Sequence, residues 1–413
     1  MKKPTQPSTL SIMLLDPQSE WISWPNQILK SGKDWNIVRL DDPDTLISRL
    51  KIGRYDAIFL ASSMQGYMER DILKRAMGIQ KNCLRFQLGA PATTAQSTQL
   101  TLELTHRIFA DPNAIDYITE TTEQLLKINR LVQRVQNKYL VDDQHPLPQA
   151  PQVFNELTLE LNNESTDAHS IAKIIEKDPT LAAKVIQIVN SAYFGIERPI
   201  SHISEAVSII GTRMLRGLAL SSHVVNLYPA HKNWRYFSFE KINQRSLLVA
   251  RLARDICKDI GADKGYVEQA FLAGLLQDIG ILIMASQDPA KYLEIMRYAV
   301  AEEKSLYAAE KEITGFYHGE IGAALMAAWN IPPLTVEAIL FHPVPSLSGD
   351  RVFRPLTAVH VADALLPPVW AKNATQMNNK LSEKYLSSIG HLKDLHRWKL
   401  LANEYKQLLK SAA

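Results

Sequence analysis

Residues 273–280 read Ala273-Gly274-Leu275-Leu276-Gln277-Asp278-Ile279-Gly280. Gln277 and Asp278 interrupt the most apolar stretch of the chain, Phe271–Ala285, which is too short and too polar to span a bilayer. From Pro151 onward almost all of the surrounding sequence has a helical pattern, with no strand signal longer than a few residues. We therefore expect an all-α domain here. Its expected N-caps lie in Ser165–Asp167 and Ser201–Ser204, and its expected helix stops are Gly211, Gly261 and Gly315.

Residues 10–112 have a different pattern, in which short apolar runs alternate with helical segments such as Thr45–Leu50 and Glu69–Met77. Strands that alternate with helices form βαβ units and a parallel sheet. Five such units in this length predict a flavodoxin-like α/β domain. The expected strands are Ser11–Leu15, Asn36–Leu40, Ala57–Ala61, Leu84–Leu88 and Arg107–Ala110.

A short heptad pattern connects the two regions, with Ile118, Leu125, Val132 and Tyr139 at seven-residue intervals. It predicts either a dimerising, signal-transmitting helix or the last helix of the first domain packed on its own sheet. Residues 142–148 then break the helix as a linker. The predicted domains are 8–117 (α/β), 118–146 (linker helix), 147–345 (helical domain) and 346–413 (a C-terminal helical extension that packs on it).

Composition limits the function classes. The 413 residues are 46% hydrophobic and 22% charged, with a formal net charge of +3, which does not indicate a nucleic-acid partner. Two distant cysteines, Cys83 and Cys257, form no disulfide framework and favour the cytoplasm. The apolar run after Lys3 is too short for a signal peptide. The sequence has no glycine-rich phosphate loop, nucleophile elbow or Cys-x-x-Cys pair.

An ordered series of motifs resembles the HDOD family, the HD-related output domains of bacterial signalling proteins. The similarity covers roughly residues 146–345, and we expect it to extend through Asp363. It implies an HD-like helical fold. The motifs are Leu147-Pro148, Asp178-Pro179-Thr180-Leu181, Asn190-Ser191-Ala192-Tyr193-Phe194-Gly195, Ile210-Gly211, Ala273 to Gly280, His318-Gly319-Glu320-Ile321-Gly322 and Trp329-Asn330-Ile331-Pro332.

The resemblance also implies that a metal site has been dismantled. HD phosphohydrolases hold metal with an early His, a His-Asp pair and a late Asp, and binuclear members add two histidines between them. In this sequence Arg245 occupies the early position and Gln277-Asp278 the pair, with Asp363 as the late Asp and His318 and His342 as the middle histidines. A guanidinium opposes a divalent cation, so we expect no metal, no cofactor and no catalytic residue. We expect Arg245 to neutralise Asp278 and Asp363 instead.

The first domain resembles a response-regulator receiver, again without its chemistry. The phosphorylated aspartate at the end of the third strand is replaced by Ala61, which has no nucleophile. Of the acidic pair on the first strand only Asp16 remains. The hydroxyl expected after the fourth strand falls near Gly89, and the lysine of the fifth falls at Asp111. We therefore expect a pseudo-receiver that packs or binds protein.

Three further features have structural and functional interpretations. Asn190 is expected to cap or to bond backbone across a turn, and the following pair, Tyr193-Phe194, to close the core or to anchor a partner. His360 lies three residues before Asp363, where a helix-surface role is expected. The tail from Asn378 to Ala413 predicts an amphipathic basic helix that either caps the bundle or binds a partner, a membrane or a nucleic acid.

Three functions remain open. The first is a non-catalytic signalling protein that acts through protein–protein interaction, with a homodimer through the linker helix as an option. The second is a residual metal-dependent phosphohydrolase that uses Asp278, His318, His342 and Asp363. The third is a nucleotide sensor that uses the vacated HD pocket.

Overall fold

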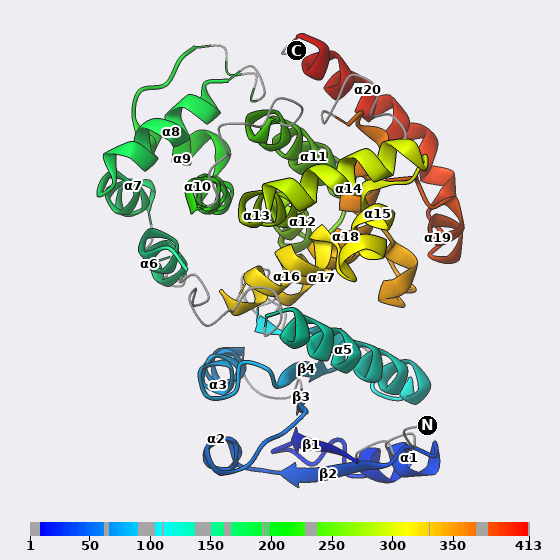
Figure 1. Ribbon diagram of the computed structural model, residues 1–413. Coiled ribbons are helices and arrows are strands. Elements are labelled where there is room, and N and C mark those ends of the chain that lie inside the picture. The colour runs from blue at the N-terminus through cyan, green and yellow to red at the C-terminus, as the bar shows by residue number, and fades with distance from the viewer. Residues whose placement is uncertain are drawn as a thin grey trace. The chain divides into compact units, whose positions relative to one another are not determined.

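The structure, a computed structural model, describes residues 9–61, 66–89, 104–109, 111–136, 150–160, 167–191, 194, 196, 198–227, 238–329, 331–368 and 379–411. The chain forms two compact units, Met1–Gln133 and Arg134–Ala413, and each is described by itself. Figure 1 shows strands in the first unit and helices in the second. The sequence therefore predicted the α/β region and the helical region in the correct order.

A five-stranded parallel sheet forms the first unit, in the order β2-β1-β3-β4-β5. This is one of the two common orders of doubly wound sheets. All five predicted strands are confirmed to within a residue at each end; residue 110 lies outside the described residues. The strands are β1 Leu10–Leu15, β2 Trp35–Leu40, β3 Ala57–Ala61, β4 Leu84–Leu88 and β5 Arg107–Phe109.

Alternate side chains of β1, β2 and β3 enter two separate cores, because successive residues of a strand point to opposite faces. Ile12 and Leu14 of β1 pack in the core that contains Ile118 and Leu125, whereas Met13 of β1 packs in the other core. The heptad residues Ile118 and Leu125 are thus buried against their own sheet, and Tyr139 lies outside the described residues. The helices are α1 Trp24–Lys30, α2 Pro43–Ile52, α3 Gly66–Ile79 and α5 Ile115–Val135.

The residues at the receiver positions have structural contacts near the carboxyl ends of the strands. The Asp16 carboxylate accepts hydrogen bonds from the backbone of Glu20 and Trp21 and pairs with Arg39 at 3.2 Å. Ala61 is fully buried at the end of β3. Gly89 donates its N–H to Phe109, and exposed Asp111 caps the turn before α5 through Asn113.

The second unit begins with five helices, and capping side chains mark the starts of α7 and α8. Asp167 accepts from the Ser170 N–H and Asp178 from the Thr180 and Leu181 N–H groups, as expected of N-caps. Asn190 exchanges two hydrogen bonds with the backbone of Ile200, which confirms its expected role across a turn. The helices are α6 Gln152–Glu160, α7 Ala168–Glu176, α8 Pro179–Val189, α9 Ile203–Ile210 and α10 Thr212–Leu227.

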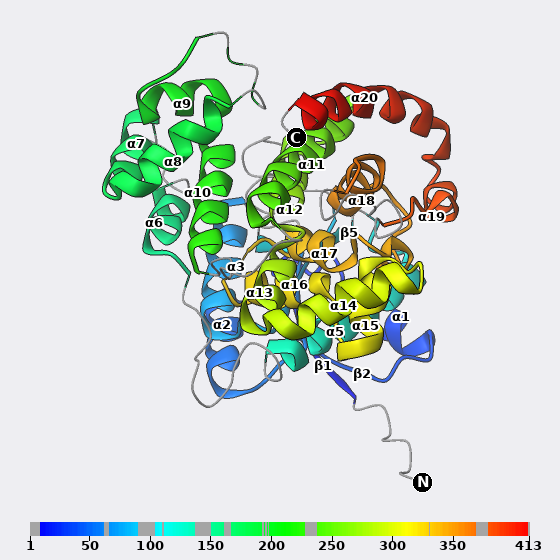
Figure 2. The same ribbon diagram turned by 45° about the horizontal axis from the view of Figure 1, so that its top comes forward.

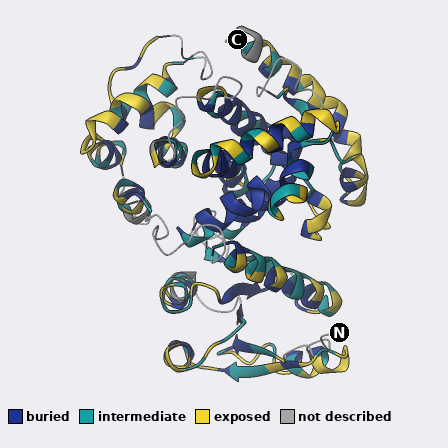
Figure 3. Cartoon of the chain, viewed as in Figure 1, coloured by how far each residue is buried: buried dark blue, intermediate teal, exposed yellow. Residues whose placement is uncertain are grey.

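Eight α-helices and a short 3₁₀ turn form the centre of this unit, and Figure 3 shows many of their residues in the buried colour. Gly211, Gly261 and Gly315 have positive φ where helices end, as predicted. The helices are α11 Phe239–Asp259, α12 Lys264–Leu276, α13 Ile279–Gln287, α14 Pro289–Ala301, α15 Leu306–Thr314, α16 His318–Ala328, α17 Pro333–Phe341, η2 Pro345–Ser348 and α18 Pro355–Leu365.

One described stretch, Lys264–Gln287, is long and apolar enough by length and composition to cross a membrane. It comprises α12 and α13, and 94% of its most apolar window is buried inside the unit. The stretch thus has the environment of a core segment of a folded helical domain.

The chain ends with α19 Glu383–Ser388, η4 Leu392–Asp394 and α20 Leu395–Ser411. Helix α20 packs against α11 and α18 and buries Trp398 and Tyr405 there. The C-terminal extension therefore caps the helical bundle, which is the structural one of its two sequence interpretations.

A buried carboxyl in the first unit generates a prediction about pH. Glu69 is 2% exposed, one of its oxygens has no partner, and burial raises its pKa to about 7. The folded state therefore holds a proton that the unfolded state releases above about pH 4.5, so stability falls as the pH rises towards 7.

We expect Glu69→Gln to stabilise the protein by about 2 kcal/mol at about pH 8 and to have little effect below about pH 4.5. Urea denaturation at both pH values measures this difference. The exposed Glu20→Gln is the control and should show no pH-dependent gain. An equal effect of Glu69→Gln at both pH values would contradict the prediction.

Candidate functional site

The break between α12 and α13 places Gln277 and Asp278 in the centre of the helical unit, where they are 0% and 3% exposed. Gly280 in the next turn lets the start of α16 approach. A Cβ atom at Gly280 would lie 1.9 Å from the carbonyl oxygen of His318, so only glycine fits this position. The Gln277–Gly280 turn thus holds His318 beside Asp278.

The Arg245 side chain comes from α11, and its guanidinium contacts the C-terminal end of α18. Nη1 contacts Asp363 Oδ1 at 2.8 Å and Asp278 Oδ2 at 3.5 Å. Nη2 donates to the carbonyls of Asp363 and Leu366 at 2.8 and 3.2 Å, and Nε donates to that of Pro367 at 3.0 Å. These five contacts equal the five N–H donors of a guanidinium. A cation at the carbonyl end of a helix is also favoured by the helix dipole.

Nitrogen donors occupy both oxygens of Asp363. Gln277 Nε2 donates to Oδ1 at 2.9 Å, beside Arg245, and Asn379 Nδ2 donates to Oδ2 at 2.8 Å. Burial by itself raises the pKa of Asp363, but the charge of Arg245 and these hydrogen bonds hold it well below its ordinary value. Asp363 is therefore an ionised carboxylate neutralised by a side-chain cation.

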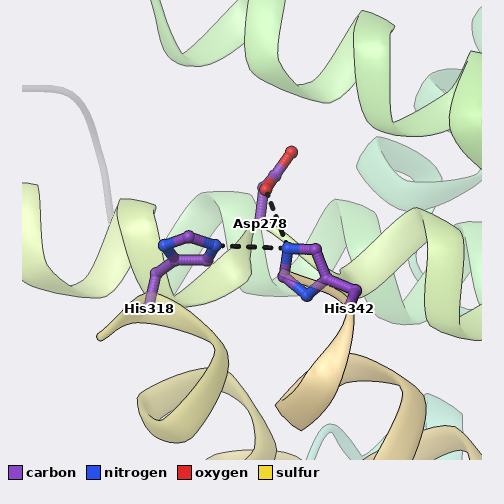
Figure 4. A group of neighbouring side chains, drawn as sticks. All are labelled: Asp278, His318 and His342. Atoms are coloured by element: carbon purple, nitrogen blue, oxygen red, sulfur yellow. Dashed lines mark hydrogen bonds and ion pairs between the residues drawn. The ribbon is translucent and has the colours of Figure 1, made fainter. Parts of the chain in front are cut away.

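Two imidazoles lie on the other side of Asp278, as Figure 4 shows. His318 Nε2 and His342 Nε2 are 3.2 Å apart, and Asp278 Oδ1 is 3.9 Å from His342 Nε2. The outer nitrogens have fixed partners, since His318 Nδ1 lies 2.6 Å from Glu310 Oε2 and His342 Nδ1 lies 2.8 Å from the carbonyl of Ile339. The two rings are thus held with their inner nitrogens facing each other.

The partners determine where the protons lie on the two rings. The Ile339 carbonyl only accepts, so His342 Nδ1 carries a proton, and burial lowers the pKa of His342 to about 3, which keeps the ring neutral. Its Nε2 is therefore an acceptor, and His318 Nε2 must donate. Burial lowers the pKa of His318, but the Glu310 carboxylate beside Nδ1 outweighs burial and raises it above its ordinary value.

Asp278 lies between the Arg245 guanidinium and the two imidazoles. Burial raises its pKa to about 6, although the Arg245 charge acts in the opposite direction. The buried group therefore places Arg245 beside Asp278 and Asp363, and His318 beside Glu310.

Asp278, His318 and His342 are also the group of described residues that could hold a metal ion, since one ligand atom from each lies within 4.8 Å of the others. Hydrogen bonds from the outer nitrogens to a carboxylate and a carbonyl are typical of metal-binding histidines. The donor set fits a metal on this side. The Asp363 side does not fit one, because Arg245 occupies it.

The described residues leave little empty space around Asp278 and its neighbours. A cavity of about 10 Å³ lined by Asp278, Asn243 and Ser246 adjoins the group, which is room for about one water molecule. All six predicted pocket residues are at most 3% exposed: Arg245, Gln277, Asp278, His318, His342 and Asp363. Among the described residues, the cavity that adjoins Asp278 is far smaller than a nucleotide.

The structure thus brings the six predicted pocket residues together, including Arg245 and Asp363, which are 118 positions apart. The surface role expected for His360 is wrong. His360 is 0% exposed, donates from Nδ1 to the His342 carbonyl at 2.7 Å and accepts from the Ser382 N–H. Asn379 and Glu310 were not predicted, because each is an isolated polar residue with no local motif.

Comparison with known proteins supports the helical assignment. Residues 147–345 match the family model of the HDOD domain, so the chain contains an HDOD domain with the predicted bounds. An uncharacterised protein of Treponema pallidum (strain Nichols) is 25% identical over 202 residues, which are 49% of this chain and 38% of that protein. The similarity thus spans well under half of that relative's length.

Among solved structures, an HDOD domain protein with unknown function from Geobacter sulfurreducens is 22% identical, with a TM-score of 0.52. The likeness covers 68% of this chain and 94% of that chain. At this level of identity it shows a shared fold and no more.

The five contacts of the Arg245 guanidinium lead to a prediction about the stability of the protein. Arg245→Met leaves Asp278 and Asp363 buried without their cation, so we expect a loss of about 3–5 kcal/mol in urea denaturation. Lys258→Met, which removes an exposed cation from the same helix, is the control and should change stability by about 0.5 kcal/mol or less. Equal small losses in the two variants would contradict the assigned role of Arg245. Adding Asp363→Asn to Arg245→Met should recover part of the loss.

Proposed function

We propose that the chain is a non-catalytic signalling protein of the bacterial cytoplasm. In this proposal the HDOD domain acts through protein–protein contacts with other signalling proteins, which the chain itself does not identify. The proposal includes no catalytic residue, no cofactor, no membrane span and no nucleic-acid partner. A homodimer through residues 118–146 stays a prediction.

One observation carries the proposal: Arg245 uses its five donors inside the pocket where HD phosphohydrolases hold a metal. A guanidinium placed there neutralises the acidic ligands without offering a Lewis acid or activated water. The small volume of the cavity that the described residues form beside Asp278 supports the same proposal. The pocket therefore has the properties of a structural core.

The first unit suits a pseudo-receiver in this proposal. Its strand order is that of flavodoxin-like domains, the order that receivers share. Ala61 at the end of β3 has no nucleophile, and Asp16 is engaged by Arg39. We therefore propose that this unit receives or relays its signal by contact and not by phosphorylation.

A second candidate function is a residual metal-dependent phosphohydrolase, and the Asp278, His318 and His342 group favours it. Two imidazoles and a carboxylate are an acceptable ligand set, and a metal bound there would supply a Lewis acid for phosphoester chemistry. The adjacent Arg245 charge and the proton on His318 both oppose metal binding. The nucleotide-sensing alternative would need a larger cavity than the one beside Asp278.

Restoring the missing histidines tests the proposal. The wild-type protein, purified with excess Mn²⁺, should contain well under one metal ion per chain and should not hydrolyse bis(p-nitrophenyl) phosphate. Arg245→His combined with Gln277→His replaces the cation with two ligands and should raise the metal content towards one per chain. The control Lys258→His adds an exposed imidazole on the same helix and should not. Elemental analysis measures the metal, and stoichiometric metal with hydrolysis in the wild type would establish the second candidate.

A further inference from the structure

The last described segment of the chain contacts the two helices that carry Arg245 and Asp363. We call residues 379–411, which contain α19, η4 and α20, the clasp. Helix α20 packs against both α11 and α18, and Figure 2 shows it in red above them. Arg245 lies on α11 and Asp363 on α18, so the clasp spans the same two helices as the buried ion pair.

The first part of the clasp contacts α18 at three positions spaced by three residues. Asn379 donates to Asp363, the Ser382 N–H donates to His360 Nε2 at 3.0 Å, and Tyr385 Oη lies 2.9 Å from Thr357 Oγ1. Asp363 belongs to the pocket itself, and His360 donates to the carbonyl of His342. The clasp therefore completes the hydrogen bonding of pocket residues directly.

The second part of the clasp contacts α11 through two carboxylates one turn apart. Asp259 Oδ2 accepts from Arg397 Nη2 at 2.9 Å and from Trp398 Nε1 at 3.1 Å. Asp255 accepts from the hydroxyl of Tyr405. The rings of Trp398 and Tyr405 are 0% and 4% exposed, so hydrophobic burial accompanies these hydrogen bonds.

Arg251, one turn before Asp255, depends on the clasp in a different way. Its guanidinium lies 5.3 Å from the ring centre of Tyr405 and 5.7 Å from that of Phe194, in the loop after α8. Both Nε and Nη1 are buried, and neither has a hydrogen-bond partner among the described residues. The cation is thus held by two aromatic faces, one of which the clasp supplies. This contact also places Phe194 against α11, while Tyr193 lies outside the described residues.

We propose that the clasp is a conformational latch of the Arg245 pocket: its docking on α11 and α18 closes the pocket, and its release opens it. The inference rests on the proposed function, in which this pocket is regulatory. It goes beyond that function by naming the element that sets the state of the pocket. Two contacts at opposite ends of the clasp support this inference. Asn379 donates a hydrogen bond to Asp363, and the ring of Tyr405 lies against the Arg251 guanidinium.

The coupling has a definite physical origin. When the clasp leaves, Asp363 Oδ2 loses the Asn379 amide and becomes a buried acceptor without that donor, which is unfavourable. The Arg251 cation loses one of its two aromatic faces at the same time. The closed pocket and the docked clasp therefore stabilise each other, and such coupling acts equally in both directions.

Hydrogen–deuterium exchange on the full chain tests the latch. Tyr405→Ala removes the hydroxyl bond to Asp255 and the ring contact with Arg251, so it weakens the attachment of α20. We expect exchange to become at least tenfold faster in residues 355–366 and 276–280 as well as in α20. The control Leu400→Ala changes a side chain of α20 that is 57% exposed and should leave all three segments unchanged. Asn379→Ala, at the other end, should accelerate exchange in α20.

Faster exchange in α20 alone after Tyr405→Ala, with residues 276–280 and 355–366 as slow as in the wild type, would overturn the latch. If Tyr405→Ala does not fold, Tyr405→Phe removes only the hydroxyl bond to Asp255 and should show the same pattern with a smaller increase. The metal content of these variants separates the two proposals. A metal-free protein without coupling refutes only the latch, whereas stoichiometric metal and hydrolysis in the wild type refute the proposed function whatever the exchange shows.

Discussion

Two carboxylates, Asp278 and Asp363, are buried around one point in the helical unit, and buried negative charges require a cation, a metal or protons beside them. Arg245 supplies the cation, and its fork geometry lets it bind carboxylate and main-chain carbonyls together. Gln277 and Asn379 supply neutral donors to the oxygens that the guanidinium leaves open. The packing of α11, α12 and α18 around this point depends on that neutralisation.

The same constraint lets an enzyme-like group of side chains serve a structural role, as the proposed function requires. On the Asp363 side the Arg245 guanidinium contacts the carboxylate, whereas on the other side the inner nitrogens of His318 and His342 face each other in a ligand-like arrangement. Glu310 and the Ile339 carbonyl fix both rings, so these histidines also join α16 to α17. Retained histidines therefore do not by themselves indicate retained catalysis, and a signalling role is compatible with them.

Local patterns in the sequence predicted the strands and helix ends, but they did not predict some of the tertiary contacts. Alternation predicted β1 to β5 because each strand is a short apolar run bounded by turns, and Gly211 and Gly315 marked helix ends because both require positive φ. The contact between Arg245 and Asp363 was predicted from the family resemblance, because the spacing of the two residues in the sequence does not indicate it. His360 was misplaced because helical spacing does not reveal that residues 382–388 cover its face. Asn379 was not predicted, because its contact with Asp363 is tertiary and no local motif indicates it.

We infer that a guanidinium and not a metal organises this pocket. A crystal grown with excess Mn²⁺ and measured above and below the manganese absorption edge distinguishes the two. We expect guanidinium density in contact with both carboxylates and no anomalous peak within bonding distance of Asp278. An anomalous peak bound by Asp278 and the two imidazoles, with the Arg245 side chain displaced from Asp363, would contradict it.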